Sequence, residues 1–183
     1  EIFSYNLTFI TFDKTRMINS LTDYNFWANR KVFYMKSFIE PGNKLPVYKS
    51  ENSGYLDITE EKNYDLRYEL EDIYGNKTLY KFTLTGKKQS IPKHKLCSQV
   101  MVWNHDNHFI TDDFTLIVPR EYLYDDLCFT YKSESTKLYQ SDKYYVNDTK
   151  VPLNDYVYMK MKLKKDSLPN KAQYGVVRLN GNK

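Results

Sequence analysis

The chain is poor in the residues and patterns that usually identify an enzyme or a membrane protein. It has only three histidines and two cysteines among 183 residues. Its longest apolar runs, such as residues 100–103, are far shorter than the roughly 18 residues that a membrane-spanning helix needs. We therefore expect no membrane span. The sequence also lacks the nucleophile-elbow, phosphate-loop, dinucleotide-binding and H-E-x-x-H patterns that identify several enzyme classes.

The charge balance does not indicate a nucleic-acid partner. The formal net charge is only +4, and lysines alternate with acidic residues along the chain. Nucleic-acid-binding domains usually carry a concentrated basic patch. We therefore expect no nucleic-acid binding.

Cysteine use gives little information about the compartment. Cys97 and Cys128 are too few for a disulfide scaffold, and both lie in strand-like segments where a small buried thiol is common. The sequence favours two unlinked buried thiols. A single bridge between neighbouring strands is the alternative.

Short segments of alternating polarity predict an all-β chain, and the clearest is a hairpin at residues 64–85. Apolar and polar residues alternate on both of its arms, as in a strand with one face on a core and one in water. Asp72, Gly75 and Asn76 supply turn chemistry between the arms. Shorter strands are expected at residues 2–12, 35–39, 45–48, 55–58, 95–103, 114–118, 127–131, 144–146, 156–163 and 174–179.

The polar residues that follow the hairpin predict a domain boundary. We expect two tandem immunoglobulin-like β-sandwich domains, at residues 1–89 and 90–183. Residues 20–34 have apolar side chains at helical spacing, so the first sandwich is expected to contain a short helical connection that Ser20 could cap.

One polar stretch, residues 104–113, contains ligand-type side chains. His108 and Asp112 stand as H-x-x-x-D, and His105 lies nearby, so these three residues are the candidate zinc ligands. A catalytic zinc needs about three protein ligands, and no histidine follows His108. Calcium coordination by Asp106, Asn107, Asp112 and Asp113 is a second possibility without a 12-residue loop pattern to support it. The simpler interpretation is a polar loop between strands, so we predict no catalytic residue and no cofactor.

The aromatic content offers a second functional signal. Trp27 and Trp103 could stack on sugar rings as ligand-binding residues. Most aromatic residues fall on alternating faces, which favours core positions or cross-strand partners.

Several short segments of the sequence together indicate a family. They are MKSFIEPGNKLPVY at residues 35–48, DIYGN at residues 72–76, VPREYLYDD at residues 118–126, and VPL at residues 151–153 with DSLP at residues 166–169. These phrases resemble the region downstream of the catalytic domain in secreted lysostaphin-type zinc peptidases of Gram-negative bacteria. These phrases are structural, and together they extend over most of the chain.

The resemblance implies a pair of immunoglobulin-like accessory domains in a periplasmic or extracellular murein endopeptidase. The zinc-binding motifs of that family belong to its catalytic domain, so no position here inherits them. The implied function is a non-catalytic module that positions or regulates the peptidase domain of the same parent chain. The alternative is a module that binds peptidoglycan or another glycan through exposed aromatics. Because the chain ends at residues 180–183 before the last expected strands, we expect an incomplete second sandwich.

Overall fold

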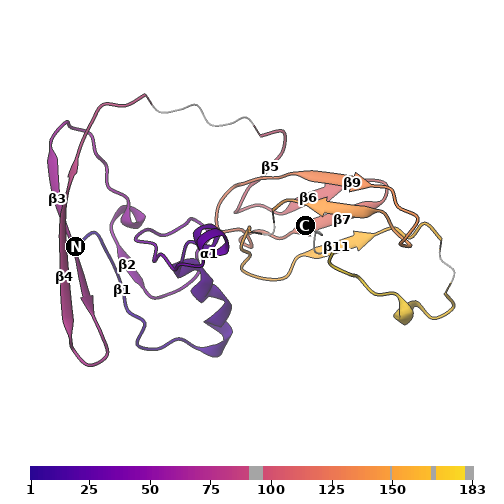
Figure 1. The fold of residues 1–183 in the computed structure, drawn as a ribbon, viewed down its shortest axis with the longest axis horizontal. Helices are drawn as coiled ribbons and strands as arrows, with labels where there is room; N and C mark the ends of the chain where they lie inside the picture. Colours follow the sequence, from indigo (N-terminus) through magenta and orange to yellow (C-terminus); the bar gives the residue numbers. More distant parts are fainter. Residues whose placement is uncertain (91–96, 149, 166–167, 180–183) are drawn as a thin grey trace.

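The structure is a computed structural model of the chain, and it describes residues 1–90, 97–148, 150–165 and 168–179. Strands predominate over helices, which confirms the predicted all-β class. Figure 1 shows an elongated molecule with an N-terminal part, residues 1–90, beside a C-terminal part, residues 97–179. None of the helical segments in the described part of the chain has the length and apolarity that crossing a bilayer requires.

The N-terminal part begins with a small antiparallel pair, β1 (Phe3–Tyr5) and β2 (Tyr48–Ser50). Between them lie a 3-10 segment, η1 (Phe12–Leu21), and a helix, α1 (Tyr24–Arg30). A second short 3-10 segment, η2 (Asn52–Gly54), follows β2. The predicted strand at residues 2–12 is therefore mostly wrong, because only its first third pairs.

The predicted helical connection is confirmed, although a different residue caps it. Asp23 is the N-cap of α1, and its Oδ1 accepts a hydrogen bond from the backbone N of Phe26 at 2.9 Å. Ser20 is buried instead, and its hydroxyl donates to the carbonyl of Met17. Lys31 ends the helix in the left-handed conformation, with φ of 58°.

The longest paired element is the predicted hairpin, formed by β3 (Asn63–Glu71) and β4 (Lys77–Thr85). Asp72 closes its turn, because Oδ1 accepts hydrogen bonds from the backbone N of Tyr74 and of Asn76, both at 2.9 Å. The pKa of the Asp72 carboxyl group is lowered, most strongly by a hydrogen bond from the Asn76 side chain and then by these backbone hydrogen bonds. Gly75 adopts φ of 83°, a conformation that glycine tolerates best.

The apolar face of this hairpin does not cover a core, which corrects the sequence prediction. Leu66 and Phe82 are half-buried near the base of the hairpin. Toward the turn, Tyr68, Leu70 and Tyr80 are 46%, 57% and 61% exposed. The alternating pattern predicted the strands correctly, but it did not show whether anything lies against them.

The C-terminal part contains three small sheets. A three-stranded antiparallel sheet has the order β11 (Tyr158–Met161), β7 (Phe114–Val118), β6 (Asn107–Ile110). β5 (Val100–Met101) pairs with β8 (Leu127–Cys128), and β9 (Tyr131–Glu134) pairs with β10 (Lys143–Val146). A 3-10 turn, η3 (Lys171–Gln173), follows β11.

The hydrophobic core of the C-terminal part lies around β7. Phe114, Leu116 and Val118 alternate inward from this strand. The rings of Tyr131 and Tyr144 lie 5.3 and 4.9 Å from the ring of Phe114, centroid to centroid. The remaining buried members of the cluster are Met101, Leu123 and Phe129.

Several predicted boundaries in the chain are wrong. β6 lies inside the stretch expected to be a polar loop, and β9 begins only at the last residue of the strand expected at residues 127–131. Residues 35–39, 55–58 and 174–179 form no strand. Two expectations concern residues that the structure does not describe. They are the end of the second sandwich at residues 180–183 and the first two residues of the strand expected at residues 95–103.

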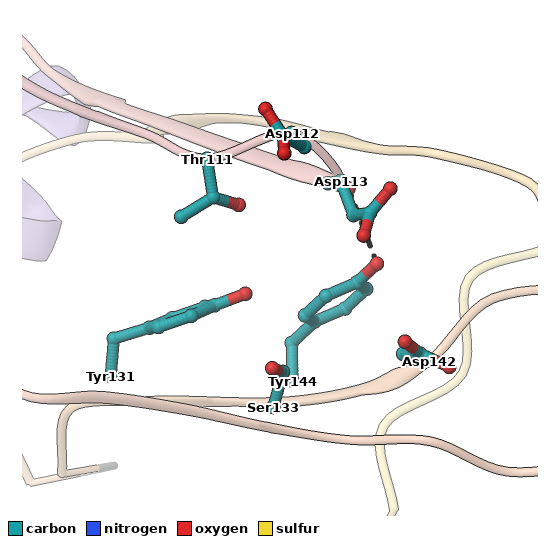
Figure 2. Close-up of a pocket in the computed structure, with 7 residues that line it drawn as sticks. All are labelled: Thr111, Asp112, Asp113, Tyr131, Ser133, Asp142 and Tyr144. Carbon is teal, nitrogen blue, oxygen red and sulfur yellow. Dashed lines mark hydrogen bonds between the residues drawn. The ribbon is translucent and has the colours of Figure 1, made fainter.

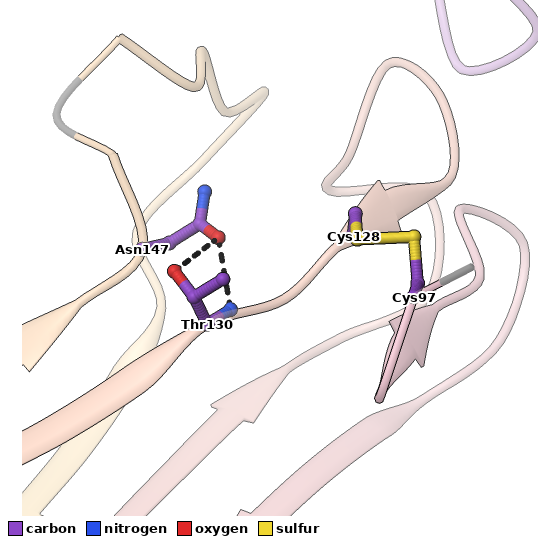
Figure 3. Close-up of a disulfide and its surroundings, with 4 residues drawn as sticks. All are labelled: Cys97, Cys128, Thr130 and Asn147. Carbon is purple, nitrogen blue, oxygen red and sulfur yellow. Dashed lines mark hydrogen bonds between the residues drawn. A yellow bond between two sulfur atoms is a disulfide. The ribbon is translucent and has the colours of Figure 1, made fainter. Parts of the chain in front are cut away.

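The two cysteines form a disulfide, so the prediction of unlinked buried thiols is wrong (Figure 3). Cys97 and Cys128 are 5.4 Å apart between Cα atoms, at one side of the β5–β8 pair. Two residues further on, the backbone N of Thr130 donates to Oδ1 of Asn147 at 3.2 Å. The short connection between β8 and β9 is therefore held at both ends.

We expect reduction of the disulfide to lower the free energy of unfolding by about 2–4 kcal/mol, because the bridge restricts the unfolded chain across a sequence separation of 31 residues. Urea unfolding with and without a phosphine reductant measures the change. A Cys97→Ser/Cys128→Ser variant is the control and should not respond to reductant. A wild-type midpoint that stays constant after complete reduction, verified by thiol titration, would contradict this prediction.

Candidate functional site

The polar stretch at residues 102–107 is organised by the side chain of Asn107. Its Oδ1 accepts from the backbone N of Val102, and its Nδ2 donates to the carbonyls of Val102 and His105, at 2.8 to 2.9 Å. Asp106 Oδ1 accepts from the backbone N of Arg120 at 2.9 Å. Because backbone groups already use these oxygens, their geometry fits a structural turn better than calcium coordination.

The candidate zinc ligands are not brought together. His105 lies in the turn before β6, where its Nδ1 is 2.6 Å from Oδ1 of Asn104. His108 is exposed on β6, and Asp112 follows in the next turn. Four residues of extended strand span about 13 Å, so the spacing of His108 and Asp112 does not align them as it would on a helix. No cluster of three or more His, Cys, Asp or Glu side chains suited to a metal occurs in the part of the chain that the structure describes.

Asp112 instead lines a polar cavity of about 200 Å³, where the β6–β7 turn faces β9 and β10 (Figure 2). The hydroxyl of Tyr131 points into this cavity from β9. The hydroxyl of Tyr144 donates to the backbone carbonyl of Asp113 at 3.2 Å. The residues that line the cavity are Thr111, Asp112, Asp113, Tyr131, Ser133, Asp142 and Tyr144.

Lysines near β11 balance two of the carboxylates in this cavity. Lys164 Nζ lies 2.5 Å from Asp142, and its hydrogen bond lowers the pKa of that carboxyl group. Lys162 Nζ lies 3.4 Å from Asp113. Burial and the nearby carboxylates raise the pKa of Tyr144, so its hydroxyl stays protonated at neutral pH. Such a lining of hydroxyl and carboxylate oxygens suits hydrogen bonds to a polar ligand.

Sequence reasoning found only Asp112 and Asp113 among the residues that line this cavity. Tyr131, Tyr144 and Asp142 come from segments 19 to 32 residues away from Asp112 along the chain. The sequence did not single out the two tyrosines, since tyrosine is common throughout the chain. Only the pairing of β9 with β10 brings the two rings together, 6.3 Å apart.

The two candidate tryptophans lie in different environments. Both rings are half-buried, and Trp103 packs against the C-terminal core. Trp27 lies on α1, where its ring stacks on Phe33 at 6.0 Å and Lys31 Nζ lies 4.5 Å above it. Phe33 is 67% exposed. Trp27 therefore remains a candidate for ligand stacking, whereas Trp103 contributes to packing.

Tyr124 lies where the two parts of the chain meet, and the pKa of its phenol is strongly raised. Tyr124 is 4% exposed, and its hydroxyl has no hydrogen-bond partner among the described residues. Burial first, and the negative charge of Glu40 second, raise its pKa to about 12. Glu40 itself accepts a hydrogen bond from Lys36 Nζ at 2.7 Å.

We expect Tyr124 to make the protein sensitive to alkali. Its pKa is near 10 when unfolded and about 12 when folded, so folding favours the protonated phenol. This contribution is fully present below pH 10, is lost as the pH rises to 12, and amounts to about 2–3 kcal/mol. In urea unfolding at pH 9 to 12, Tyr124→Phe should lose less stability than the wild type.

Tyr74→Phe, at the exposed hairpin turn, is the matched control and should follow the wild type through this pH range. Equal losses in the Tyr124→Phe variant and the wild type would show that Tyr124 ionises as easily in the folded protein as in the unfolded chain.

Comparison with known proteins identifies one related region. Residues 98–183, just under half of the chain, match the sequence model of the Zu5-like domain. No curated protein and no solved structure matches the chain. The C-terminal part, with its core around β7, is therefore similar to Zu5-like domains.

Proposed function

We propose that this chain is a non-catalytic accessory module of an exported cell-wall zinc endopeptidase, and that it positions or regulates the peptidase domain of the same polypeptide. The observation that carries the proposal is the uncovered apolar face of the β3–β4 hairpin. A two-stranded hairpin is at best marginally stable by itself in water. Contiguous exposed apolar surface on a folded protein typically marks a site of protein contact.

The hairpin presents two chemically different faces. One face carries the cross-strand pairs Leu66–Phe82 and Tyr68–Tyr80, and its exposure increases toward the turn. The opposite face is charged, and Lys77 lies 3.2 Å from Glu71 across the strands. Near the middle of the hairpin, the hydroxyl of Tyr68 donates to Ser37, whereas Leu70, nearer the turn, is 57% exposed. A neighbouring domain of the same polypeptide is the proposed occupant of the exposed part of this face.

Other features support an exported module. The Cys97–Cys128 disulfide suits the oxidising periplasm or the extracellular space. We infer that the two β-rich parts are immunoglobulin-like sandwiches, the architecture implied by the phrases that resemble lysostaphin-type peptidases. Two of these phrases have structural roles, since residues 72–76 form the hairpin turn and residues 35–48 contain the turn at the junction between the parts.

In the longer exported polypeptide, we expect Leu70→Ser to lower peptidoglycan hydrolysis severalfold, because it removes an apolar contact to the peptidase domain. The matched control is Leu79→Ser. Leu79 lies next to Leu70 in the hairpin and is similarly exposed, at 50%, but it is on the charged face. Release of soluble muropeptides from purified peptidoglycan measures the activity.

Equal activity of the two variants would exclude the apolar face as the contact. The chain alone should release no muropeptides when zinc is added. Cleavage by the purified chain that a chelator abolishes would refute the non-catalytic assignment.

A second candidate function is binding of peptidoglycan or another glycan. It is favoured by the stack of the half-buried Trp27 ring on the exposed Phe33 ring, since flat aromatic faces pack well against sugar rings. The polar cavity beside Tyr131 and Tyr144 is a further place where sugar hydroxyls could be bound.

If the chain binds glycans through α1, Trp27→Ala should lower retention on insoluble peptidoglycan about fivefold or more, because stacking on aromatic rings contributes on the order of 1 kcal/mol. Phe12→Ala is the control, since Phe12 is 96% exposed outside this stack. Co-sedimentation measures retention. Retention that is absent in the wild type, or unchanged in Trp27→Ala, would exclude this use of the stack.

A further inference from the structure

A tight turn of the N-terminal part lies against the C-terminal part. Gly42, within the Pro41–Gly42 turn, is buried there. Its backbone N donates to the carbonyl of Tyr124 at 2.8 Å, and its carbonyl accepts from Nδ2 of Asn154, also at 2.8 Å. Both backbone polar groups of this one residue are therefore bonded across the junction, as buried backbone groups require.

Asn154 connects three segments of the chain. It is only 6% exposed, and its Nδ2 also donates to the carbonyl of Glu121 at 2.9 Å. Its backbone N donates to the carbonyl of Tyr122 at 2.8 Å. An isolated β-bridge between Leu123 and Leu153 holds the same two segments together. The surface that receives Gly42 is thus already fixed within the C-terminal part.

The close approach at this point leaves no room for a side chain. A Cβ atom at Gly42 would lie 2.0 Å from the carbonyl oxygen of Leu123, and backbone atoms cannot move aside easily. The φ of Gly42 is outside the left-handed region, so space is the limiting factor here and backbone conformation is not. Leu45 and Leu123, 4% and 1% exposed, bury apolar surface close to the turn.

Polar contacts extend the junction to η1 and α1. Each exposed ion pair contributes little by itself, but together the pairs show that the contact is wider than one turn. They are Lys44–Glu121 at 3.1 Å, Arg16–Asp155 at 3.8 Å and the hydrogen bond from Lys150 to Asn29 at 2.9 Å.

We propose that residues 121–124 and Asn154 form a docking surface for the Gly42 turn, and that this contact locks the two parts into one rigid body. The hairpin at one end of the molecule is then held at a fixed orientation to the β7 sheet at the other end (Figure 1). This contact between the two parts does not depend on the proposed peptidase or glycan partner, since every residue in it belongs to this chain.

Backbone ¹⁵N relaxation of the whole chain tests the lock. In the wild type, the two parts should share one rotational correlation time. In Gly42→Ala and in Asn154→Leu, both parts should have a shorter correlation time than in the wild type, because each would then tumble as a body of about half the size. Hydrogen exchange of the amide at position 42 should accelerate about tenfold or more in both variants, because its bond to Tyr124 is broken or weakened.

Two matched controls accompany these variants. Gly175→Ala places a methyl group where nothing lies within 4 Å, and Asn25→Leu changes an exposed position on α1. Both should keep the wild-type correlation time. A wild-type correlation time as short as that of a body of half the size, or an unshortened one in Asn154→Leu, would overturn the proposal. If Gly42→Ala does not fold, the wild type and Asn154→Leu decide the question.

Discussion

The packing of aromatic and aliphatic side chains around Phe114 is the interaction on which the stability of both parts of the chain depends. Six buried apolar residues form this cluster, whereas only Leu21 and Leu45 are buried apolar residues among the described residues of the N-terminal part. Burial of apolar surface is the main favourable term in folding. The N-terminal part therefore depends on what it lies against, and the turn at Gly42 places it on the part that has the larger core.

This unequal distribution explains why the hairpin has an uncovered face. Its strands are long and well paired, and the Asp72 turn fixes their register, so local hydrogen bonds define its shape without a core. What pairing cannot do is remove the side chains of Leu70 and Tyr80 from water. A surface of this kind is costly in isolation and becomes favourable when a second surface covers it.

Sequence patterns predicted the local features best and the distant contacts worst. The alternation in residues 64–85 and the turn residues gave the hairpin correctly, because both depend on neighbours in the chain. The strand β6 was missed because Asn107 and His108 are polar, although Phe109 faces the core. The metal-ligand hypothesis failed for a related reason, since spacing predicts proximity only when the type of element is known. The disulfide and the contact of Gly42 with Asn154 join residues 31 and 112 positions apart, and no local pattern encodes them.

A rigid junction and an exposed hairpin together constrain what such a module can do. If the two parts moved freely, contact of the hairpin with a neighbouring domain would leave the C-terminal part unoriented. With Gly42 seated on residues 121–124, contact at the hairpin also sets the direction of the polar cavity near Tyr144. The two proposed functions are therefore compatible, because one rigid body can both space a catalytic domain and present a glycan-binding surface. The orientation of the cavity relative to the hairpin depends on Gly42, a residue with no side chain, which is why a single added methyl group is the sharpest perturbation available.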